Sequence, residues 1–289
     1  MITRQRTLLR LLELEKGKVS KLRLFKLAFL IREHAKQAPA SAVYEFLPYQ
    51  FGPYSFTLNH ELKSLERDGW LRIFDAEICA ARPLENETRK IERFLATAIE
   101  SLVEKYRTVS TDELVTDVYR RFPWYTAGAR NKARRATTIP IARNAVYTVG
   151  YEGLMLDGLL DLLLRNGIKQ LVDVRCNPVA RRFGFHKSTL ERHCKDVGLT
   201  YVHLPALGIP SSWRQDLVDS AAYDHLFARY ETEILPVNDN WIDVVCRLVR
   251  ETPSALMCME ADARCCHRTR LARLVAERTE LPLRELRCP

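Results

Sequence analysis

Several familiar sequence features are missing from this chain of 289 residues, and each absence narrows its function. No apolar run approaches the roughly 18 residues of a membrane span, and no signal peptide precedes the first amphipathic segment, so we expect a cytoplasmic protein without a membrane partner. There is no phosphate-binding G-x-x-x-x-G-K-[ST] and no G-x-S-x-G elbow. The stretch 150–153, Gly-Tyr-Glu-Gly, lacks the full G-x-G-x-x-G of dinucleotide sites. The sequence therefore indicates no cofactor.

A second Cys-x2-Cys is also missing, although the chain has eight cysteines. Structural zinc sites usually combine two such knuckles, so the spacing of Cys258, Cys265, Cys266 and His267 argues against a bound metal. We predict none. A cysteine nucleophile stays open, because Cys266 adjoins His267 at the start of a predicted helix, where a thiol has a lowered pKa. In the expected cytoplasmic setting the cysteines do not imply disulfides.

Positive charge is concentrated in the first half of the chain. Residues 1–145 contain 26 Lys and Arg against 17 Asp and Glu, whereas residues 146–289 contain 19 of each. The whole net charge of +9 therefore comes from the first half. A basic domain joined to a neutral one is typical of a protein whose first part binds a polyanion. We predict double-stranded DNA as the partner, while the oligomeric state does not follow from the sequence.

The first 75 residues have the pattern of a small helical DNA-binding domain. Apolar residues recur at helical spacing over 4–37, and Gly17 and Ser20 break that run into two helices. A short strand, a helix over 56–68 and a strand over 70–74 follow. This order resembles a winged helix-turn-helix. The phrase Phe51-Gly52-Pro53-Tyr54-Ser55, with Leu58, Leu62, Leu65 and Gly69 after it, resembles small bacterial and archaeal winged-helix regulators and antitoxin-like domains.

Two further helices are expected over 88–106 and 111–122, and they complete a mainly helical domain, 1–129. A basic connector, 130–143, follows it. Its cations could simply be solvated, but next to a basic winged-helix candidate they could equally contact phosphates. The DNA-binding candidates are Tyr54, Arg130, Lys132, Arg134 and Arg135.

The second half, 144–289, alternates strand and helix patterns, which predicts an α/β fold with a mostly parallel sheet and flanking helices. Strands are expected over 145–149, 170–174, 200–204 and 255–259, with an edge strand at 283–286. The helices between them are expected over 154–166, 187–197, 223–235, 241–251 and 268–277.

Chemically reactive side chains follow four of these strands. In a parallel sheet the carboxyl ends share one edge, so Glu152, Asp173 and Glu260 could meet in one pocket. Each group also has a structural alternative. Asp173 could form an ion pair with Arg175, Glu260 could pair with an arginine of its own loop, and a histidine between apolar neighbours is often a core residue.

These motifs resemble the DUF488 family. The residues that carry the resemblance occur in order over about residues 146–288: Thr148-Val149-Gly150-Tyr151-Glu152-Gly153, Asp173-Val174-Arg175 with Pro178 and Arg181, Phe183, Tyr201-Val202-His203-Leu204 with Leu207-Gly208, and Cys258-Met259-Glu260 with Cys266-His267-Arg268. The extra Cys265 departs from the usual family phrase. Because the family is defined as a domain of unknown function, the resemblance implies a fold and a site rather than a reaction.

Our leading hypothesis is an enzyme that acts on a flipped base of DNA, most simply a glycosylase that hydrolyses an N-glycosidic bond, and a role in defence against modified foreign DNA would suit it. A nuclease with a carboxylate-bound metal and a non-catalytic winged-helix regulator with a ligand- or redox-sensing α/β domain are the alternatives. The predicted catalytic residues are Asp173, Glu260 and Glu152, and the predicted substrate-binding residues are Tyr151, Arg175, Arg181, His203 and Arg268.

Overall fold

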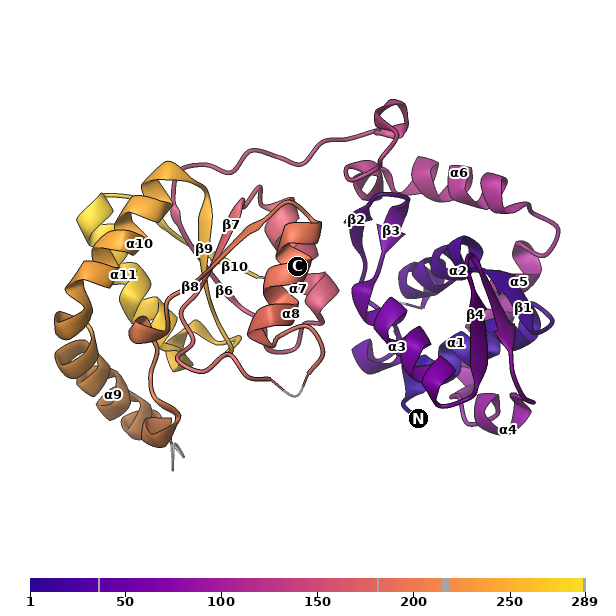
Figure 1. Cartoon of the computed structure of the whole chain (residues 1–289), viewed down its shortest axis with the longest axis horizontal. Coiled ribbons are helices and arrows are strands. Elements are labelled where there is room, and N and C mark those ends of the chain that lie inside the picture. The colour runs from indigo at the N-terminus through magenta and orange to yellow at the C-terminus, as the bar shows by residue number, and fades with distance from the viewer. Residues whose placement is uncertain (36, 181, 215–218, 288–289) are drawn as a thin grey trace. The chain divides into compact units, whose positions relative to one another are not determined.

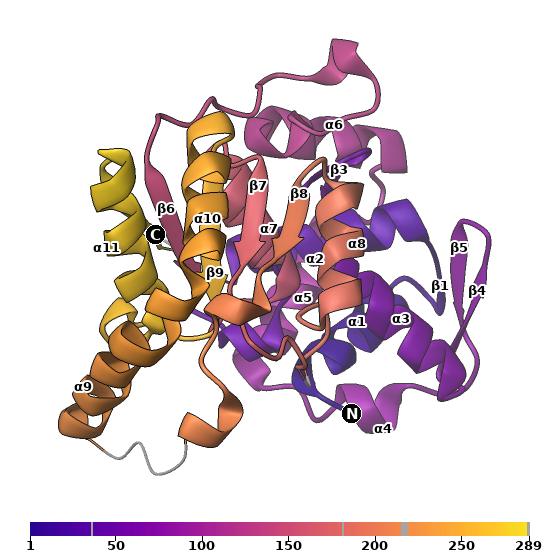
Figure 2. The same ribbon diagram turned by 60° about the vertical axis from the view of Figure 1, so that its left-hand side comes forward.

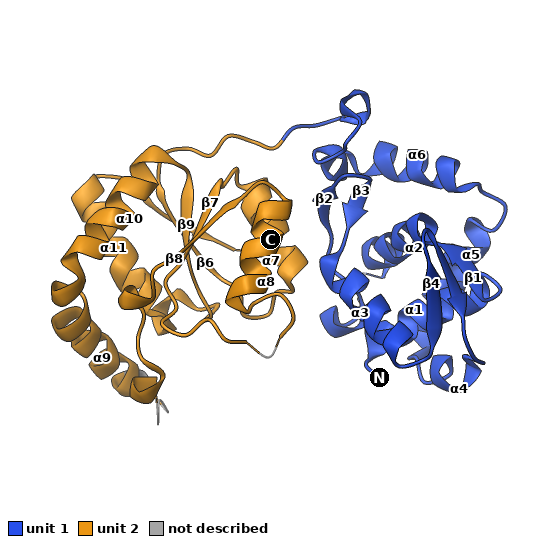
Figure 3. Ribbon diagram, in the orientation of Figure 1, with its two compact units in different colours: residues 1–138 blue, residues 139–289 orange. Residues whose placement is uncertain are grey.

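The chain folds into two compact units, Met1–Thr138 and Ile139–Pro289 (Figure 3). The computed structural model describes residues 1–35, 37–180, 182–214 and 219–287. The division between the units falls within the basic segment 130–143. Within the described residues, no helix combines the length and the apolar character that crossing a membrane requires.

Unit 1 is mainly helical, and its helices begin where the sequence offers caps. The side chain of Ser20 accepts a hydrogen bond from the Arg23 amide, and Ser55 does the same for Leu58. Ser110 and Glu113 form a reciprocal capping box. The helices are α1 (Thr3–Leu14), α2 (Lys21–His34), α3 (Phe56–Arg67), α4 (Glu85–Thr88), α5 (Arg93–Lys105) and α6 (Thr111–Arg121) (Figure 1).

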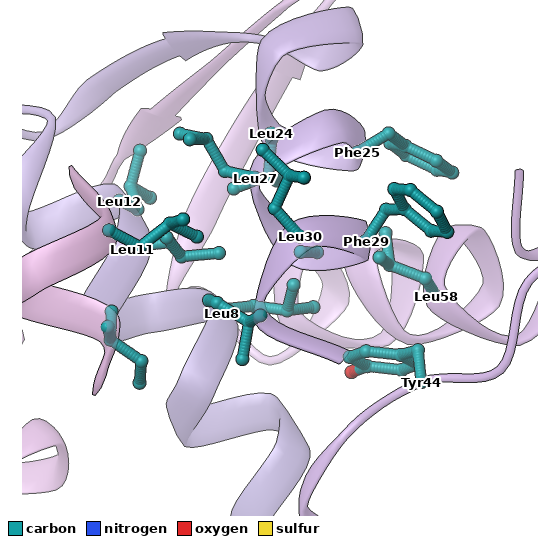
Figure 4. Packing of buried hydrophobic residues seen from close by; sticks show 14 of the residues in the cluster. Leu8, Leu11, Leu12, Leu24, Phe25, Leu27, Phe29, Leu30, Tyr44 and Leu58 are labelled. Atoms are coloured by element: carbon teal, nitrogen blue, oxygen red, sulfur yellow. The ribbon is translucent and has the colours of Figure 1, made fainter. Parts of the chain in front are cut away.

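The core of unit 1 is built around α1 and α2. Leucines from both helices lie beside Phe25, Phe29 and Tyr44 in one cluster (Figure 4). The helix α2 is buried from Arg23 to Ile31, far more than a surface helix with a single apolar stripe. It is therefore the central element of this unit.

Two small antiparallel sheets complete unit 1. One contains three strands in the order β1 (Lys18–Ser20), β5 (Glu77–Ala80), β4 (Leu71–Phe74), and the other is the hairpin β2 (Leu47–Tyr49) and β3 (Gly52–Tyr54). Strands β1 and β5 were not predicted from the sequence. The prediction of one helix over 88–106 was also wrong. The chain leaves the helical conformation between α4 and α5, where Ile91 is buried against the core.

Unit 2 contains a five-stranded sheet in which every strand pair is parallel, which confirms the α/β fold with a mostly parallel sheet that the sequence predicted. Its strand order is β10-β6-β9-β7-β8. The three central strands are almost completely buried, which explains why they consist of continuous apolar runs. The strands are β6 (Val146–Gly150), β7 (Gln170–Asp173), β8 (Thr200–His203), β9 (Ser254–Cys258) and β10 (Leu283–Leu286).

Helices cover both faces of this sheet. Figures 1 and 2 show α7 (Leu156–Arg165) and α8 (Lys187–Asp196) on one face, and α10 (Asp239–Glu251) and α11 (His267–Thr279) on the other. The chain leaves β6 toward one face and leaves the neighbouring β9 toward the opposite face. Such a switch point opens a crevice at the carboxyl ends of the two strands, where open α/β sheets bind ligands. One further helix, α9 (Ser220–Arg229), precedes α10.

Candidate functional site

The loops after β6 and β9 are joined by backbone hydrogen bonds. The Glu152 amide donates to the Met259 carbonyl over 2.8 Å, and the Glu152 carboxylate accepts the Ala261 amide over 3.0 Å. A Cβ atom on Gly150 would lie 2.0 Å from the Glu260 carbonyl oxygen, so only glycine permits this approach. Residues far apart in sequence are thereby brought to one place.

A cavity of about 480 Å³ opens beside these loops. Glu152, Glu260, His267 and Arg214 contribute polar groups to its wall. Asp262 and Cys265 also line the cavity, and its apolar part consists of Ile209, Met259 and three residues of α9: Tyr223, Leu226 and Phe227. Polar groups that converge beside apolar side chains are a usual feature of a small-molecule site, and the volume lies within the common range of about 300–1,000 Å³.

Glu260 is held in this cavity by Arg214. The guanidinium Nη1 lies 2.5 Å from Glu260 Oε1, and the Glu260 side chain is 14% exposed. Burial works against the charge of Arg214, but Glu260 and Cys258 more than offset it, so the pKa of Arg214 is raised. The pair fixes the orientation of the carboxylate without removing it from the cavity.

Behind Glu260 lies a buried cluster of two thiols and an imidazole. Cys258 at the end of β9 and Cys266 at the N-cap of α11 both donate to Glu260 Oε2, over 3.2 and 3.0 Å. His267 Nδ1 lies 3.7 Å from Cys258 Sγ. Potential metal-ligating atoms of Cys258, Cys266 and His267 lie within 4.8 Å of one another, and the exposure of each residue is 1%.

The two thiols differ in acidity. A hydrogen bond from Cys266 lowers the pKa of Cys258 well below its usual range, and the charges of His267 and Arg214 act in the same direction against the cost of burial. Burial raises the pKa of Cys266, and the neighbouring Cys258 raises it further. When the pair loses its first proton, the negative charge is therefore located mainly on Cys258.

Asp173 and Arg175 form a separate, buried ion pair. Arg175 Nη2 lies 2.6 Å from Asp173 Oδ2, Nε lies 2.9 Å from Oδ1, and the exposed fractions of the two side chains are 7% and 0%. The hydroxyl of Tyr201 donates to the same carboxylate over 2.6 Å. Neither Asp173 nor Arg175 lines the cavity. We expected both residues to share a pocket with Glu260, and this prediction was wrong. Asp173 and Arg175 bind each other at the end of β7 and do not face the cavity.

Two other predicted substrate-binding residues belong to the same structural network. Tyr151 accepts a hydrogen bond from Arg175 Nη1 over 3.0 Å and stacks on Phe185 at 4.2 Å, with only 5% of its surface exposed. His203 Nε2 donates to the Arg175 carbonyl over 2.9 Å. These contacts hold the loop after β7 in place.

Arg268 is completely buried beneath the loop after β9. It donates to the carbonyls of Glu260 and Ala261, and its Nη2 lies 3.4 Å from Glu285 Oε1. Its Nε has no hydrogen-bond partner among the described residues. Arg268 therefore supports the backbone at Glu260 instead of facing the cavity. Arg181 lies outside the described residues.

The DNA-binding candidates of unit 1 fall into two groups. Arg130, Lys132, Arg134 and Arg135 are all exposed, and the last of these donates to the Ala129 carbonyl over 2.8 Å. Tyr54 is half-buried and stacks on Phe25 with ring centroids 4.9 Å apart. The tyrosine thus contributes to packing, whereas the four cations are available to solvent.

Neither Arg214 nor the cavity residues of α9 were predicted from the sequence. Arg214 ends a short 3-10 helix, Ser211–Arg214, in a connection without clear periodicity. From the sequence alone, the apolar residues of α9 could equally be residues of the hydrophobic core. Too little weight was also given to Cys258 and His267, because they belong to the end of a strand and the start of a helix and do not form a zinc knuckle.

Comparisons with known proteins bear only on unit 2. No curated protein and no solved structure matches the chain. Residues 155–275, which run from α7 into α11 and include the Asp173 pair and the thiol cluster, match the family model described as a domain of unknown function, DUF488.

Proposed function

We propose that this protein is a DNA-binding hydrolase that takes one flipped nucleotide into the cavity of unit 2 and cleaves its N-glycosidic bond. The observation that carries the proposal is the placement of Glu152 and Glu260 in the wall of one cavity, next to the aromatic side of α9. A flat base could pack against Tyr223 and Phe227, while its sugar would lie toward the carboxylates.

Glu260 is the residue we assign to proton transfer. It would remove a proton from a water molecule whose oxygen bonds to C1′ of the sugar, while the electron pair of the breaking C–N bond leaves with the base. The base then takes a proton from solvent. Arg214 would hold the carboxylate in position, and Glu152 would stabilise positive charge that develops on the sugar.

Unit 1 supports the DNA-binding part of the proposal by its order of elements. The succession is α1, β1, α2, the β2–β3 hairpin, α3, β4, β5, with β1 pairing β5 and β5 pairing β4. Apart from the hairpin inserted before α3, this is the arrangement expected of a winged helix. In this interpretation α3 is the recognition helix, and β4 with β5 is the wing. The exposed side chains of α3 include Lys63 and Arg67, and Arg72 is exposed on β4.

The experiment is incubation of the full chain with plain and base-modified duplex DNA, followed by alkali and gel analysis. Breaks that require alkali are expected, because loss of a base leaves an alkali-labile abasic site. Breaks without alkali would overturn the glycosylase in favour of the nuclease, although the ion pair of Asp173 leaves that carboxylate poorly suited to hold a metal.

The first prediction concerns Glu260→Gln. Removal of a positioned acid or base should lower turnover on the order of 10²-fold or more. DNA affinity should barely change, because phosphate contacts by the basic unit supply most of it. Glu251→Gln, at the exposed end of α10, is the matched control and should retain full activity. An equal loss of binding and turnover would mean that Glu260 only maintains the fold.

The thiol cluster also favours a second candidate, a winged-helix regulator that senses a ligand or redox change through unit 2. A cysteine with a lowered pKa next to a second cysteine, as Cys258 is next to Cys266, is a common basis of redox sensing. The same gel separates the two functions. A regulator would produce no breaks with any duplex, and its DNA affinity would respond to oxidation or to metal.

A further inference from the structure

We infer that Cys258, Cys266 and His267 form a binding site for Zn²⁺, with a fourth coordination position beside Glu260 that faces the cavity. The site goes beyond the proposed function, because metal binding is measured without DNA and would stand if no base were ever removed.

The donor set suits zinc. Two thiolates and one imidazole are borderline-soft ligands, and three protein ligands with one exchangeable position are typical of reactive zinc sites. Ligand atoms at about 2.0–2.3 Å around a tetrahedral ion lie roughly 3.5–3.8 Å apart. Cys258 Sγ and His267 Nδ1 are 3.7 Å apart. Only small side-chain rotations are needed to place these atoms at the corners of a tetrahedron.

The histidine is oriented as a metal ligand should be. His267 Nε2 lies 3.2 Å from the Val174 carbonyl, and a carbonyl can only accept, so Nε2 carries the proton. The lone pair of Nδ1 then accepts a hydrogen bond from Arg214 Nη2, 3.2 Å away, and also lies 3.7 Å from Cys258 Sγ, so a bound ion would replace Arg214 as the partner of Nδ1. A second ring nitrogen that donates to a backbone carbonyl is the usual outer contact of zinc-bound histidine. In unit 2 this contact ties the site to the loop after β7.

Burial explains why the cluster is a site for an ion and not for a larger ligand. Cys258 and Cys266 are each 1% exposed and do not line the cavity, whereas Glu260 and His267 do. Glu260 Oε2 lies within 3.2 Å of both sulfur atoms but is not one of the three grouped ligand atoms, so the fourth corner of the tetrahedron would lie beside Glu260. A zinc-bound water at that corner would be next to the Glu260 carboxylate and open to the cavity.

Metal would also suit the local backbone. Cys258 ends β9, and Cys266 with His267 begins α11, so a bound ion would connect the two ends of the loop 259–265. If the proposed function holds, that water is the one Glu260 deprotonates, since zinc lowers the pKa of bound water. Only this role of the zinc-bound water rests on the proposed function.

The test is metal analysis of the full chain, purified without an affinity tag that binds metal and without chelator. We expect about one zinc per chain, and Co²⁺ reconstitution should produce sulfur-to-cobalt charge-transfer absorption of the strength of two thiolates. Cys266→Ser should weaken Zn²⁺ binding by roughly 100-fold or more, beyond what loss of an outer-shell contact usually costs. Cys265→Ser is the matched control one residue away and should bind Zn²⁺ as the unaltered chain does, since Cys265 is outside the cluster.

Three outcomes would overturn the inference. The purified chain could fail to retain or take up Zn²⁺ at micromolar concentration. Its cobalt form could lack thiolate absorption, a result that needs no variant and therefore survives a folding failure of Cys266→Ser. Mass analysis of the chain could show a disulfide between Cys258 and Cys266. Metal binding without any base removal would leave this site in place and remove only the proposed function.

Discussion

At the scale of single residues, unit 2 has two ion pairs with different roles: one supports the structure, and the other is placed for chemistry. Asp173 and Arg175 are satisfied in the interior by each other and by neighbours such as Tyr151 and Tyr201. Glu260 and Arg214 instead pair at a cavity wall, with 14% and 30% of their side chains exposed. A buried pair with all its polar atoms engaged has no capacity left for substrate. The partly exposed pair of Glu260 and Arg214 can exchange its contacts with a ligand, which is why the chemistry is assigned to Glu260.

The structural role of Asp173 predicts a large effect on stability. Asp173→Asn leaves the Arg175 guanidinium buried without its counter-charge, and we expect a loss of about 3–5 kcal/mol in the free energy of unfolding of unit 2. Urea denaturation monitored on unit 2 measures it. Glu233→Gln, which breaks an exposed pair with Arg229 in the same unit, should cost less than about 1 kcal/mol. Equal, small losses would show that the Asp173 pair is not a structural support.

At the scale of elements, the packing of α2 against the β2–β3 hairpin depends on a buried lysine. Lys26 donates from Nζ to the carbonyls of Phe51 and Pro53, over 2.6 and 3.2 Å, and only 1% of the residue is exposed. Burial lowers the pKa of Lys26 to about 7. The helix thus carries one group whose charge changes near neutral pH on folding.

That lysine makes the stability of unit 1 depend on pH. The unfolded chain binds this proton up to pH about 10.5, while the folded chain releases it near pH 7, so the unfolded state holds more protons between the two values. The free energy of unfolding should therefore rise with pH from 7 to about 10 and fall as pH is lowered through that window. The full contribution of the shift is on the order of 3–5 kcal/mol.

Hydrogen exchange of peptides from residues 21–54, in the intact chain, measures this dependence. Lys26→Met should remove most of the rise between pH 7 and 10, because it has no proton to exchange. A variant with the same pH slope as the unaltered chain would show that other groups are responsible. Lys21→Met is the comparison on the same helix: burial also lowers the pKa of Lys21, but Lys21 is less buried, so this variant should change the slope by less than Lys26→Met does.

At the scale of the whole molecule, charge is divided between the two units. Residues 1–138 hold 25 Lys and Arg against 17 Asp and Glu, and residues 139–289 hold 20 against 19. Such a division separates affinity from chemistry, because phosphate contacts can be made by one unit while the other examines a nucleotide. The proposed function uses both units, whereas the zinc site needs unit 2 alone.

The division predicts how DNA binding depends on salt. Replacing Lys63 and Arg67 of α3 together by Ala should weaken duplex binding by the full chain and reduce the slope of log affinity against log salt by about 2. The control replaces Arg89 and Arg93 by Ala, which removes the same charge from exposed positions away from α3. Fluorescence anisotropy at several salt concentrations measures both. Identical slopes for the two double variants would remove α3 from the DNA-binding surface.

Local sequence was sufficient to determine most elements of this fold. The apolar runs of β6, β7 and β9, the caps of α2 and α3, and the glycines that follow α7 and α8 are short-range signals. Gly167 and Gly198 both adopt positive φ, as helix-ending glycines do. The parallel sheet of unit 2 follows from the alternation of such segments. The sequence was less informative for β1 and β5, which are short, and for the break before α5.

The candidate site was decided by tertiary structure. Sequence alone placed Glu260 and the thiols at the end of a strand. The spacing of Cys258, Cys266 and His267 argued against a metal site, because residues 8 or 9 apart do not match a zinc-knuckle motif. They come together because β9 and α11 meet across a turn whose shape Arg268 and Gly150 determine. Arg214 and α9 enter from a distant connection. Long-range packing leaves no local pattern, and it alone separated the buried Asp173 pair from the cavity.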